Sequence, residues 1–384
     1  MIKVLEAHTM EIDDPAAAAM EIMNRLDLGG LLKNSVGIMV CHLEFMESGS
    51  VEEICSLLPF DVAGINTLCS ATSAAAGQEM LAIAVLTSDD VSFAAGVSDS
   101  LADSQREKLA DLYARTSSRL PDVSKLMLTF APLMDAISGD KIVEFLNETS
   151  GGIPAFGTLP SDFSTVFRDP RVICNGQTYN DRVAIIVMGG NINPTFNISM
   201  LTSDKMLERK AIVTNVEGPI LKEVNGRPSI EYFESIGVAR NGQIDNAHII
   251  FPITIDCNDG APPITRSILK QLPNGDVVLG GSAPLNSTLG VGGIDSEDVL
   301  DSAGKIVRQC THGEGSFAFF VSCIVRNFVL GLDDMAEIER VQSVAGGGIP
   351  WLFVYSGGEI CPVRSSDGQL INRFHNMTLV SCVI

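Results

Sequence analysis

The sequence has 384 residues, of which 46% are hydrophobic and only 19% are charged. This balance supplies a large apolar core and excludes a mainly disordered chain. The formal net charge is −21 and the 26 Lys and Arg residues are scattered. Nucleic-acid binding is therefore not expected, because such a surface repels phosphate backbones.

The first residues lack the basic region and long apolar stretch of a signal peptide, and no apolar run nears the roughly 20 residues of a membrane helix. The nine cysteines form no CxxC pair and mostly lie in apolar contexts. This pattern is typical of free, buried thiols in a reducing compartment. We therefore expect a cytoplasmic protein without membrane insertion.

Three segments of the chain share one pattern of predicted elements. In each, a short apolar strand precedes an amphipathic helix, and a second strand then ends in a small polar turn. These strand, helix and strand ranges are 36–41, 51–58 and 60–72; 125–131, 140–147 and 151–162; and 317–323, 335–341 and 347–359. A further strand is predicted after each segment, at 80–86, 182–188 and 375–384.

The repeated unit is therefore strand–helix–strand–strand. A helix between the first two strands allows them to pair in parallel, and we expect a hairpin to bring the next strand in antiparallel. The predicted fold is of the α/β class (mixed α+β), with mixed parallel and antiparallel sheets flanked by outer helices. Chance similarity between ordinary α/β units remains the alternative to duplication. Two further packing helices are predicted at 15–26 and 100–118.

A change of composition suggests a domain boundary near the middle of the chain. The strand predicted at 196–201 is followed by the charged segment 203–210, and the strands predicted beyond it, at 232–238, 249–257 and 276–281, have fewer helices between them. We expect two domains, 1–210 and 211–384.

The last thirty residues place polar groups at the ends of two apolar runs. A double-glycine turn after 352–354 bears Glu359 and Cys361, and a second apolar run returns beside Asn376. Polar side chains delivered from strand ends are how rigid scaffolds present binding groups. We expect a recognition pocket here, and an ordinary hairpin with a polar tip is the alternative. The expected ligand-binding residues are Arg266, Arg326, Tyr355, Ser356, Gly357, Gly358, Glu359, Asn376 and Thr378.

The two arginines are candidates for binding a ligand carboxylate, since arginine binds carboxylates bidentately. Structural ion pairs are the alternative, and the sequence leaves open whether Arg266, Arg326 and Glu359 share one pocket. Cys361 with His375 as base is a weaker candidate for a catalytic pair, against an inert cysteine. The five histidines form no HxH or HExxH pattern, and the glycine-rich segments lack a phosphate-binding lysine. No metal or other cofactor is expected.

Several of these segments resemble the FIST family, a prokaryotic sensory module with an amino-terminal and a carboxy-terminal part. The similar segments are 58–67, 86–93, 152–162, 355–362 and 374–379, which span nearly the whole chain. The resemblance implies a domain that senses small molecules such as amino acids, and many members are fused to kinase, cyclase or chemotaxis outputs. No such output follows here, so any signal is expected to pass to a separate partner. The family offers no catalytic residues to transfer, and only Gly358, Glu359, Asn376 and Thr378 occupy matching motif positions.

Three hypotheses follow. The first is a cytoplasmic sensor that binds a small molecule, an amino acid being one candidate, and acts through a separate signalling partner. The second, less favoured, is an enzyme that uses Cys361 or Glu359. The third is a structural or assembly protein with no ligand. A homo-oligomer is compatible with all three.

Overall fold

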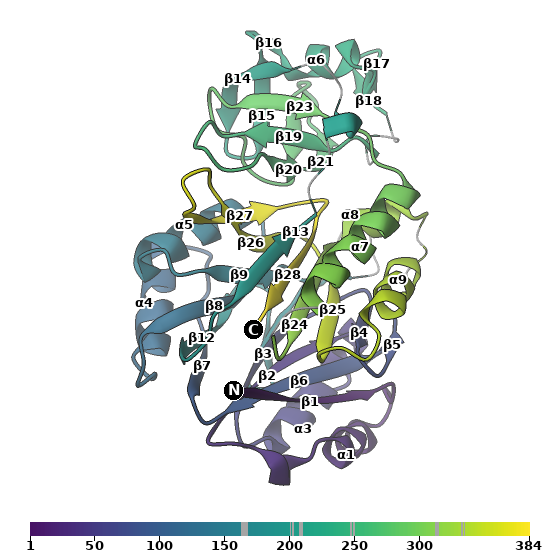
Figure 1. The fold of residues 1–384 in the computed structure, drawn as a ribbon. Helices are drawn as coiled ribbons and strands as arrows, with labels where there is room; N and C mark the ends of the chain where they lie inside the picture. Colours follow the sequence, from purple (N-terminus) through teal and green to yellow (C-terminus); the bar gives the residue numbers. More distant parts are fainter. Residues whose placement is uncertain are drawn as a thin grey trace.

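The computed structural model of the chain describes residues 1–162, 168–199, 201, 203–206, 210–245, 248, 250–311, 315–331, 333 and 335–384. Three six-stranded mixed sheets form the body of the molecule, and a further sheet forms a lobe at the top of Figure 1. Helices cover the outer faces of the body: α4 and α5 on the left, α7 and α9 on the right, and α1 and α3 at the bottom. This architecture confirms the predicted mixed α/β class.

The body consists of three units that repeat the same order of elements. The first contains β1 (Ile2–Thr9), α1 (Pro15–Arg25), β2 (Asn34–Cys41), α2 (Leu43–Glu47), α3 (Ser50–Leu57), β3 (Asp61–Asn66), β4 (Ser70–Thr72), β5 (Ala76–Gly77) and β6 (Leu81–Ser88). The second contains β7 (Val91–Val97), α4 (Gln105–Ser117), β8 (Ser124–Phe130), α5 (Gly139–Ser150), β9 (Ala155–Thr158), β10 (Val172–Cys174), β11 (Gln177–Tyr179) and β12 (Ala184–Gly190). The third contains β13 (Thr195–Ile198), α7 (Ser296–Thr311), β24 (Ala318–Cys323), α8 (Ile324–Val329), α9 (Ala336–Ala345), β25 (Trp351–Ser356), β26 (Glu359–Arg364), β27 (Leu370–His375) and β28 (Leu379–Val383).

The three sheets have equivalent strand orders: β1-β6-β2-β3-β10-β11, β7-β12-β8-β9-β26-β27 and β13-β28-β24-β25-β4-β5. The predicted parallel pairs are confirmed as β2 with β3, β8 with β9 and β24 with β25. The predicted hairpin from the second strand to the next long strand is wrong, because β6, β12 and β28 pair antiparallel with β2, β8 and β24 instead.

The short hairpin after each second strand leaves its own unit and joins a neighbouring sheet. β4 pairs with β25 of the third unit, β10 pairs with β3 of the first, and β26 pairs with β9 of the second. Each unit thus gives a hairpin to one neighbour and receives one from the other, so the three sheets are completed only together.

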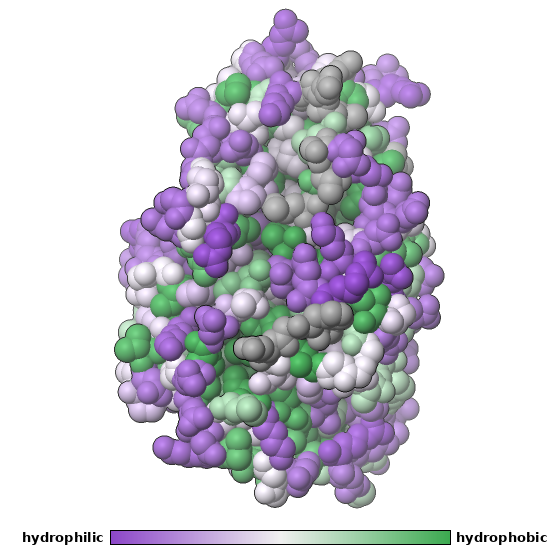
Figure 2. Space-filling view, in the orientation of Figure 1, coloured by the Kyte–Doolittle hydropathy of each residue, from purple (hydrophilic) through white to green (hydrophobic). Residues whose placement is uncertain are grey.

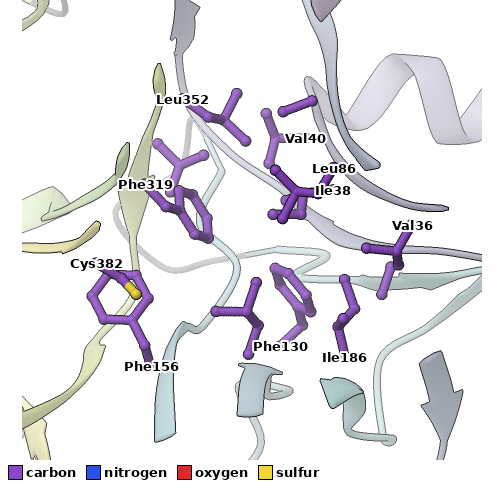
Figure 3. Packing of buried hydrophobic residues seen from close by; sticks show 14 of the residues in the cluster. Val36, Ile38, Val40, Leu86, Phe130, Phe156, Ile186, Phe319, Leu352 and Cys382 are labelled. Carbon is purple, nitrogen blue, oxygen red and sulfur yellow. The ribbon is translucent and has the colours of Figure 1, made fainter. Parts of the chain in front are cut away.

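The inner faces of the three sheets meet in one hydrophobic core. Figure 3 shows side chains from all three units in it, including Ile38, Phe130 and Phe319, and all three are fully buried. The outer faces bury a second set of side chains, such as Met39, against the helices. Strands covered on both faces read as continuous apolar runs, which explains why the sequence pattern located them.

Local sequence sets the ends of the helices. The carboxylate of Asp14 accepts hydrogen bonds from the backbone N–H groups of Ala16 and Ala17 and so caps α1. Ser138 caps α5, which ends at Gly151 in the left-handed conformation. The fourth helix begins at Gln105 rather than at residue 100 as predicted.

The lobe is inserted in the third unit, between β13 and α7. We call it the inserted lobe; it comprises β14 (Ala211–Glu217), β15 (Ile220–Val224), β16 (Arg227–Pro228), α6 (Ser229–Ser235), β17 (Ala239–Arg240), β18 (Gln243–Ile244), β19 (Ile253–Asp256), β20 (Ile264–Arg266), β21 (Ile268–Gln271), β22 (Val277–Leu279) and β23 (Thr288–Val291). The helix α6 stands in place of part of the strand predicted at 232–238, and its buried residues are Ser229 and Phe233. The division into domains 1–210 and 211–384 stays a prediction.

Hydrophilic residues cover most of the face shown in Figure 2, and hydrophobic residues gather in its middle and lower part, near the two chain ends. None of the helices in the described part of the chain combines the length and apolar character that a membrane crossing requires.

Candidate ligand-binding site

The carboxy-terminal motif is divided between two sheets. β25 ends at Ser356, and after Gly357 and Gly358 the chain enters β26, which belongs to the sheet of the second unit. A Cβ atom at Gly358 would lie 2.3 Å from the ring of Phe374, so only glycine fits this close approach. The motif therefore forms the crossing of one chain segment from sheet to sheet rather than one hairpin.

Glu359 is fully buried at the start of β26. Its Oε2 atom accepts hydrogen bonds from the Thr378 hydroxyl at 2.8 Å and the Thr378 backbone N–H at 3.3 Å, whereas Oε1 has no partner within the described residues. Burial raises the pKa of this carboxyl to about 8, although the bonds from Thr378 and the nearby Cys323 thiol and Arg326 oppose the shift. Glu359 is therefore mainly protonated at neutral pH.

Arg326 forms a buried ion pair with Glu337. Its Nε and Nη2 atoms donate to Glu337 Oε1 at 2.9 and 2.6 Å, and Nη2 also donates to Ser302 Oγ at 3.0 Å and to the Val299 carbonyl at 2.9 Å. Glu337 Oε2 accepts from Ser322 at 2.8 Å. Arg326 is 1% exposed, and none of these bonds to the described residues involves Nη1.

Arg266 is engaged through all three guanidinium nitrogens. It pairs with Asp140 at the start of α5, and it donates to the carbonyls of Phe374 at 2.7 Å, Thr265 at 3.2 Å and Ser282 at 3.2 Å. These bonds attach the inserted lobe to α5 and β27. Its role as a ligand residue stays a prediction.

A cleft of about 300 Å³ lies where the inserted lobe meets the third unit. Its wall combines the end of β13, both connections to the lobe, one face of α7, Arg326 of α8 and Met377 of the loop before β28. The lining residues are Ile198, Ser199, Leu201, Lys205, Pro252, Thr265, Ile294, Asp298, Asp301, Ser302, Lys305, Ile306, Gln309, Arg326 and Met377. Met377 has a left-handed backbone, with φ of 59°, which is uncommon for a residue with a side chain.

Of the residues that the sequence suggested for ligand binding, Arg326 lines this cleft directly. Asn376 and Thr378 flank Met377, and Glu359 lies behind Thr378. The Asn376 backbone N–H donates to the Thr265 carbonyl at 3.2 Å, and its Oδ1 atom has no partner within the described residues.

Tyr355 and Ser356 do not line the cleft and lie where the three units join. The Tyr355 carbonyl accepts from the hydroxyls of Thr67 and Ser161 at 2.8 and 2.9 Å, and Ser356 bonds to the Thr158 hydroxyl at 2.8 Å. The Tyr355 ring packs in the core under the outer helices, so both residues join units in this structure.

The geometry around Cys361 does not activate its thiol. The side chain lies in the central core, and burial raises the pKa of the thiol. His375 Nε2 lies 3.2 Å from the backbone carbonyl of Cys361, rather than bonding to the sulfur. Burial and the charge of Arg266 lower the pKa of His375 to about 3. All nine cysteines are free, and no cluster of potential metal ligands occurs in the part of the chain that the structure describes.

The α7 side of the cleft is not among the residues predicted from the sequence. A signal was present, because Val299, Ala303, Ile306, Val307 and Cys310 are spaced as the apolar stripe of a helix, and all five are buried. No spacing in the sequence could have shown that Lys305, on the same helix, lines this cleft.

Two family models match the chain: the FIST N domain at residues 35–227 and the FIST C domain at residues 231–362. No curated protein matches it. Among solved structures, the chain is similar to the "cyanuic acid hydrolase from A. caulinodans", with 9% sequence identity and a TM-score of 0.38, over 100% of this chain and 99% of the other. A likeness at this level carries no inference about activity or ligand.

Proposed function

Because the chain belongs to the FIST family, whose domains are generally sensory domains of signal transduction suggested to bind small ligands, we propose that it binds a small molecule in the cleft beside α7. The ligand carries a carboxylate, an amino acid being one candidate, and a separate signalling partner reads the bound state. The proposed location is the cytoplasm.

The observation that carries this proposal is the state of Arg326. A guanidinium that is 1% exposed lines the cleft, and Glu337 and Ser302 fix its orientation while Nη1 remains without a partner among the described residues. A fixed, buried cation with one spare donor nitrogen is suited to an anion, because charge-assisted hydrogen bonds are strong where water is excluded.

The position of the cleft supports a sensory role. Leu201 and Lys205 belong to the first connection between body and inserted lobe, and Ile294 belongs to the second. A ligand held there contacts both connections, so its binding free energy favours one arrangement of the lobe over others. A volume of about 300 Å³ is at the lower end of ligand pockets, which suits a small molecule.

The enzyme hypothesis has less support, because neither Cys361 nor Glu359 lines the cleft and the thiol is buried in the core. The assembly hypothesis predicts that no small molecule stabilises the protein, and the following experiment separates it from the sensor hypothesis.

A thermal-shift screen of the full chain against amino acids and small carboxylates tests the proposal. A ligand at 100 times its Kd adds about 2.7 kcal/mol to the free energy of unfolding, which should raise the midpoint by a few degrees. Ile294→Trp should fill the cleft and abolish the shift, whereas Leu285→Trp, at an exposed residue of the same lobe outside the cleft, should retain it. A shift of equal size in both variants, or no shift across the screen, would refute this site.

A further inference from the structure

We infer that the ligand of this cleft is a small monocarboxylate with an apolar body and no ammonium group. The inference rests on the proposed function and narrows it, because it separates carboxylic acids from the amino acids that carry the same side chain.

Hydrogen-bond donors are in excess at the cleft. Arg326 contributes Nη1, which is unbonded within the described residues, and Lys305 lies on the exposed side of α7 without an ion pair in that part of the chain. A ligand that supplies acceptor oxygens can bond to both groups, and hydrogen bonds to charged donors contribute more than those between neutral groups.

The two carboxylates of the cleft, Asp298 and Asp301, each form an ion pair. Asp298 Oδ1 lies 2.8 Å from Lys205 Nζ, and its Oδ2 accepts from the Asp295 backbone N–H at 3.1 Å. The Asp301 side chain is 72% exposed and pairs with Arg340 at 3.7 Å, so it lies mostly in water. An ammonium group of the ligand would lose its hydration on binding. It would gain no new ion pair in return, because Asp298 is already paired and Asp301 lies mostly in water.

The side chains around the cleft favour a ligand with a single negative charge. The pairs Lys205–Asp298, Arg340–Asp301 and Arg326–Glu337 are each neutral, and Lys305 remains. A second ligand carboxylate would approach Asp298 and Asp301, and like charges at short range repel. The ligand is therefore a monoanion rather than a dicarboxylate.

The rest of the wall is apolar and sets the nature of the ligand body. The apolar lining residues are Ile198, Leu201, Pro252, Ile294, Ile306 and Met377. A volume of about 300 Å³ is at the lower end of ligand pockets. A small acid with an apolar body suits that volume and these walls.

Isothermal titration of the full chain with branched acids and amines of five or six carbon atoms tests the inference. The probes are 4-methylpentanoate, 4-methyl-2-oxopentanoate, L-leucine, 3-methylbutylamine and the dicarboxylate 3-methylglutarate. At least one of the two monocarboxylates should bind about tenfold or more tightly than leucine and than the dicarboxylate, and the amine should not bind. Lys305→Ala should weaken binding of the acid severalfold, and Arg308→Ala, which removes an exposed charge of the same helix outside the cleft, should not.

Tighter binding of leucine, or of the dicarboxylate, would overturn the inference and leave the proposed function intact if Ile294→Trp abolished that binding. Failure of both monocarboxylates to bind would overturn the inference as well. The proposed function itself fails only if no compound of the wider screen gives a shift that depends on Ile294.

Discussion

Replacing Glu359 by Gln tests how strongly the protein interior opposes the charge of this carboxyl. Glutamine cannot ionise, and its amide oxygen can accept the same two bonds from Thr378 that Oε2 accepts in the wild type. The variant should therefore match the wild type below pH 4.5, where the folded and unfolded wild-type chains are both protonated, and exceed it in stability at higher pH, where the unfolded chain carries an ionised glutamate.

The magnitude follows from the pKa, which rises from 4.5 to about 8 on folding. At about 1.4 kcal/mol for each pKa unit, the wild type keeps this stability below pH 4.5 and loses about 5 kcal/mol as the pH rises to about 8, because only the unfolded chain releases its proton in that range. Between pH 5 and pH 8.5 the loss is about 4 kcal/mol.

Urea unfolding of both proteins at these two pH values measures the effect. All other titrating groups cancel in the difference between wild type and Glu359→Gln, so the difference should change by about 4 kcal/mol in favour of the variant at the higher pH. Parallel stabilities at both pH values, within about 1 kcal/mol, would show that the folded protein does not disfavour the ionised carboxylate and would refute the reasoning.

Three further predictions concern buried groups. Glu337→Gln should cost about 3–5 kcal/mol in urea unfolding, because it leaves the Arg326 charge buried without a counter-charge, and adding Arg326→Met should recover part of this loss; a cost below about 1 kcal/mol would contradict the role of the pair. Arg266→Met should leave Asp140 unpaired and loosen the inserted lobe, so amide hydrogen exchange should quicken in β20 and β27 while β8 keeps its protection; unchanged exchange in β20 would argue against this attachment. Cys361 should resist an alkylating reagent in the folded protein for as long as the structure stays closed, and mass spectrometry showing rapid native labelling would contradict its burial.

The strands of the body could be predicted because each is covered on both faces and reads as an apolar run. Three pairs of such runs, each pair with a helix between its two members, predicted the parallel strand pairs. The exchange of hairpins could not be predicted, since β4 has three residues and pairs with β25, far along the chain. Partner choice for so short a strand depends on which sheet edge lies nearby in the fold, and no local pattern records that.

The inserted lobe also made the first two elements of the third unit hard to recognise in the sequence. β13 and α7 correspond to β1 and α1 of the first unit, but the lobe separates them in sequence. The segment α8 escaped prediction because its six residues follow β24 without a break.

Residue chemistry identified the unusual groups of the candidate site but not their neighbours. Glu359 and both arginines stood out because charged residues in apolar contexts must be paired or perturbed. Their distribution depends on tertiary contacts: Arg266 faces α5, whereas Arg326 reaches the cleft. Lys305 and the connections of the lobe carry no local signature, since their meeting is set by how the lobe docks.

The exchanged hairpins determine when each sheet can be completed during synthesis. When the ribosome has completed β4 at Thr72, its partner β25 begins only at Trp351, about 14 to 56 s later at about 5–20 residues per second. During that interval the first two units have emerged, yet β9 lacks the hairpin β26–β27 and shows an open sheet edge, a template for wrong pairing with other chains. The nascent protein therefore passes through a long, aggregation-prone stage that ends only after β26 and β27 leave the ribosome, and its yield in cells should depend on chaperones that shield sheet edges.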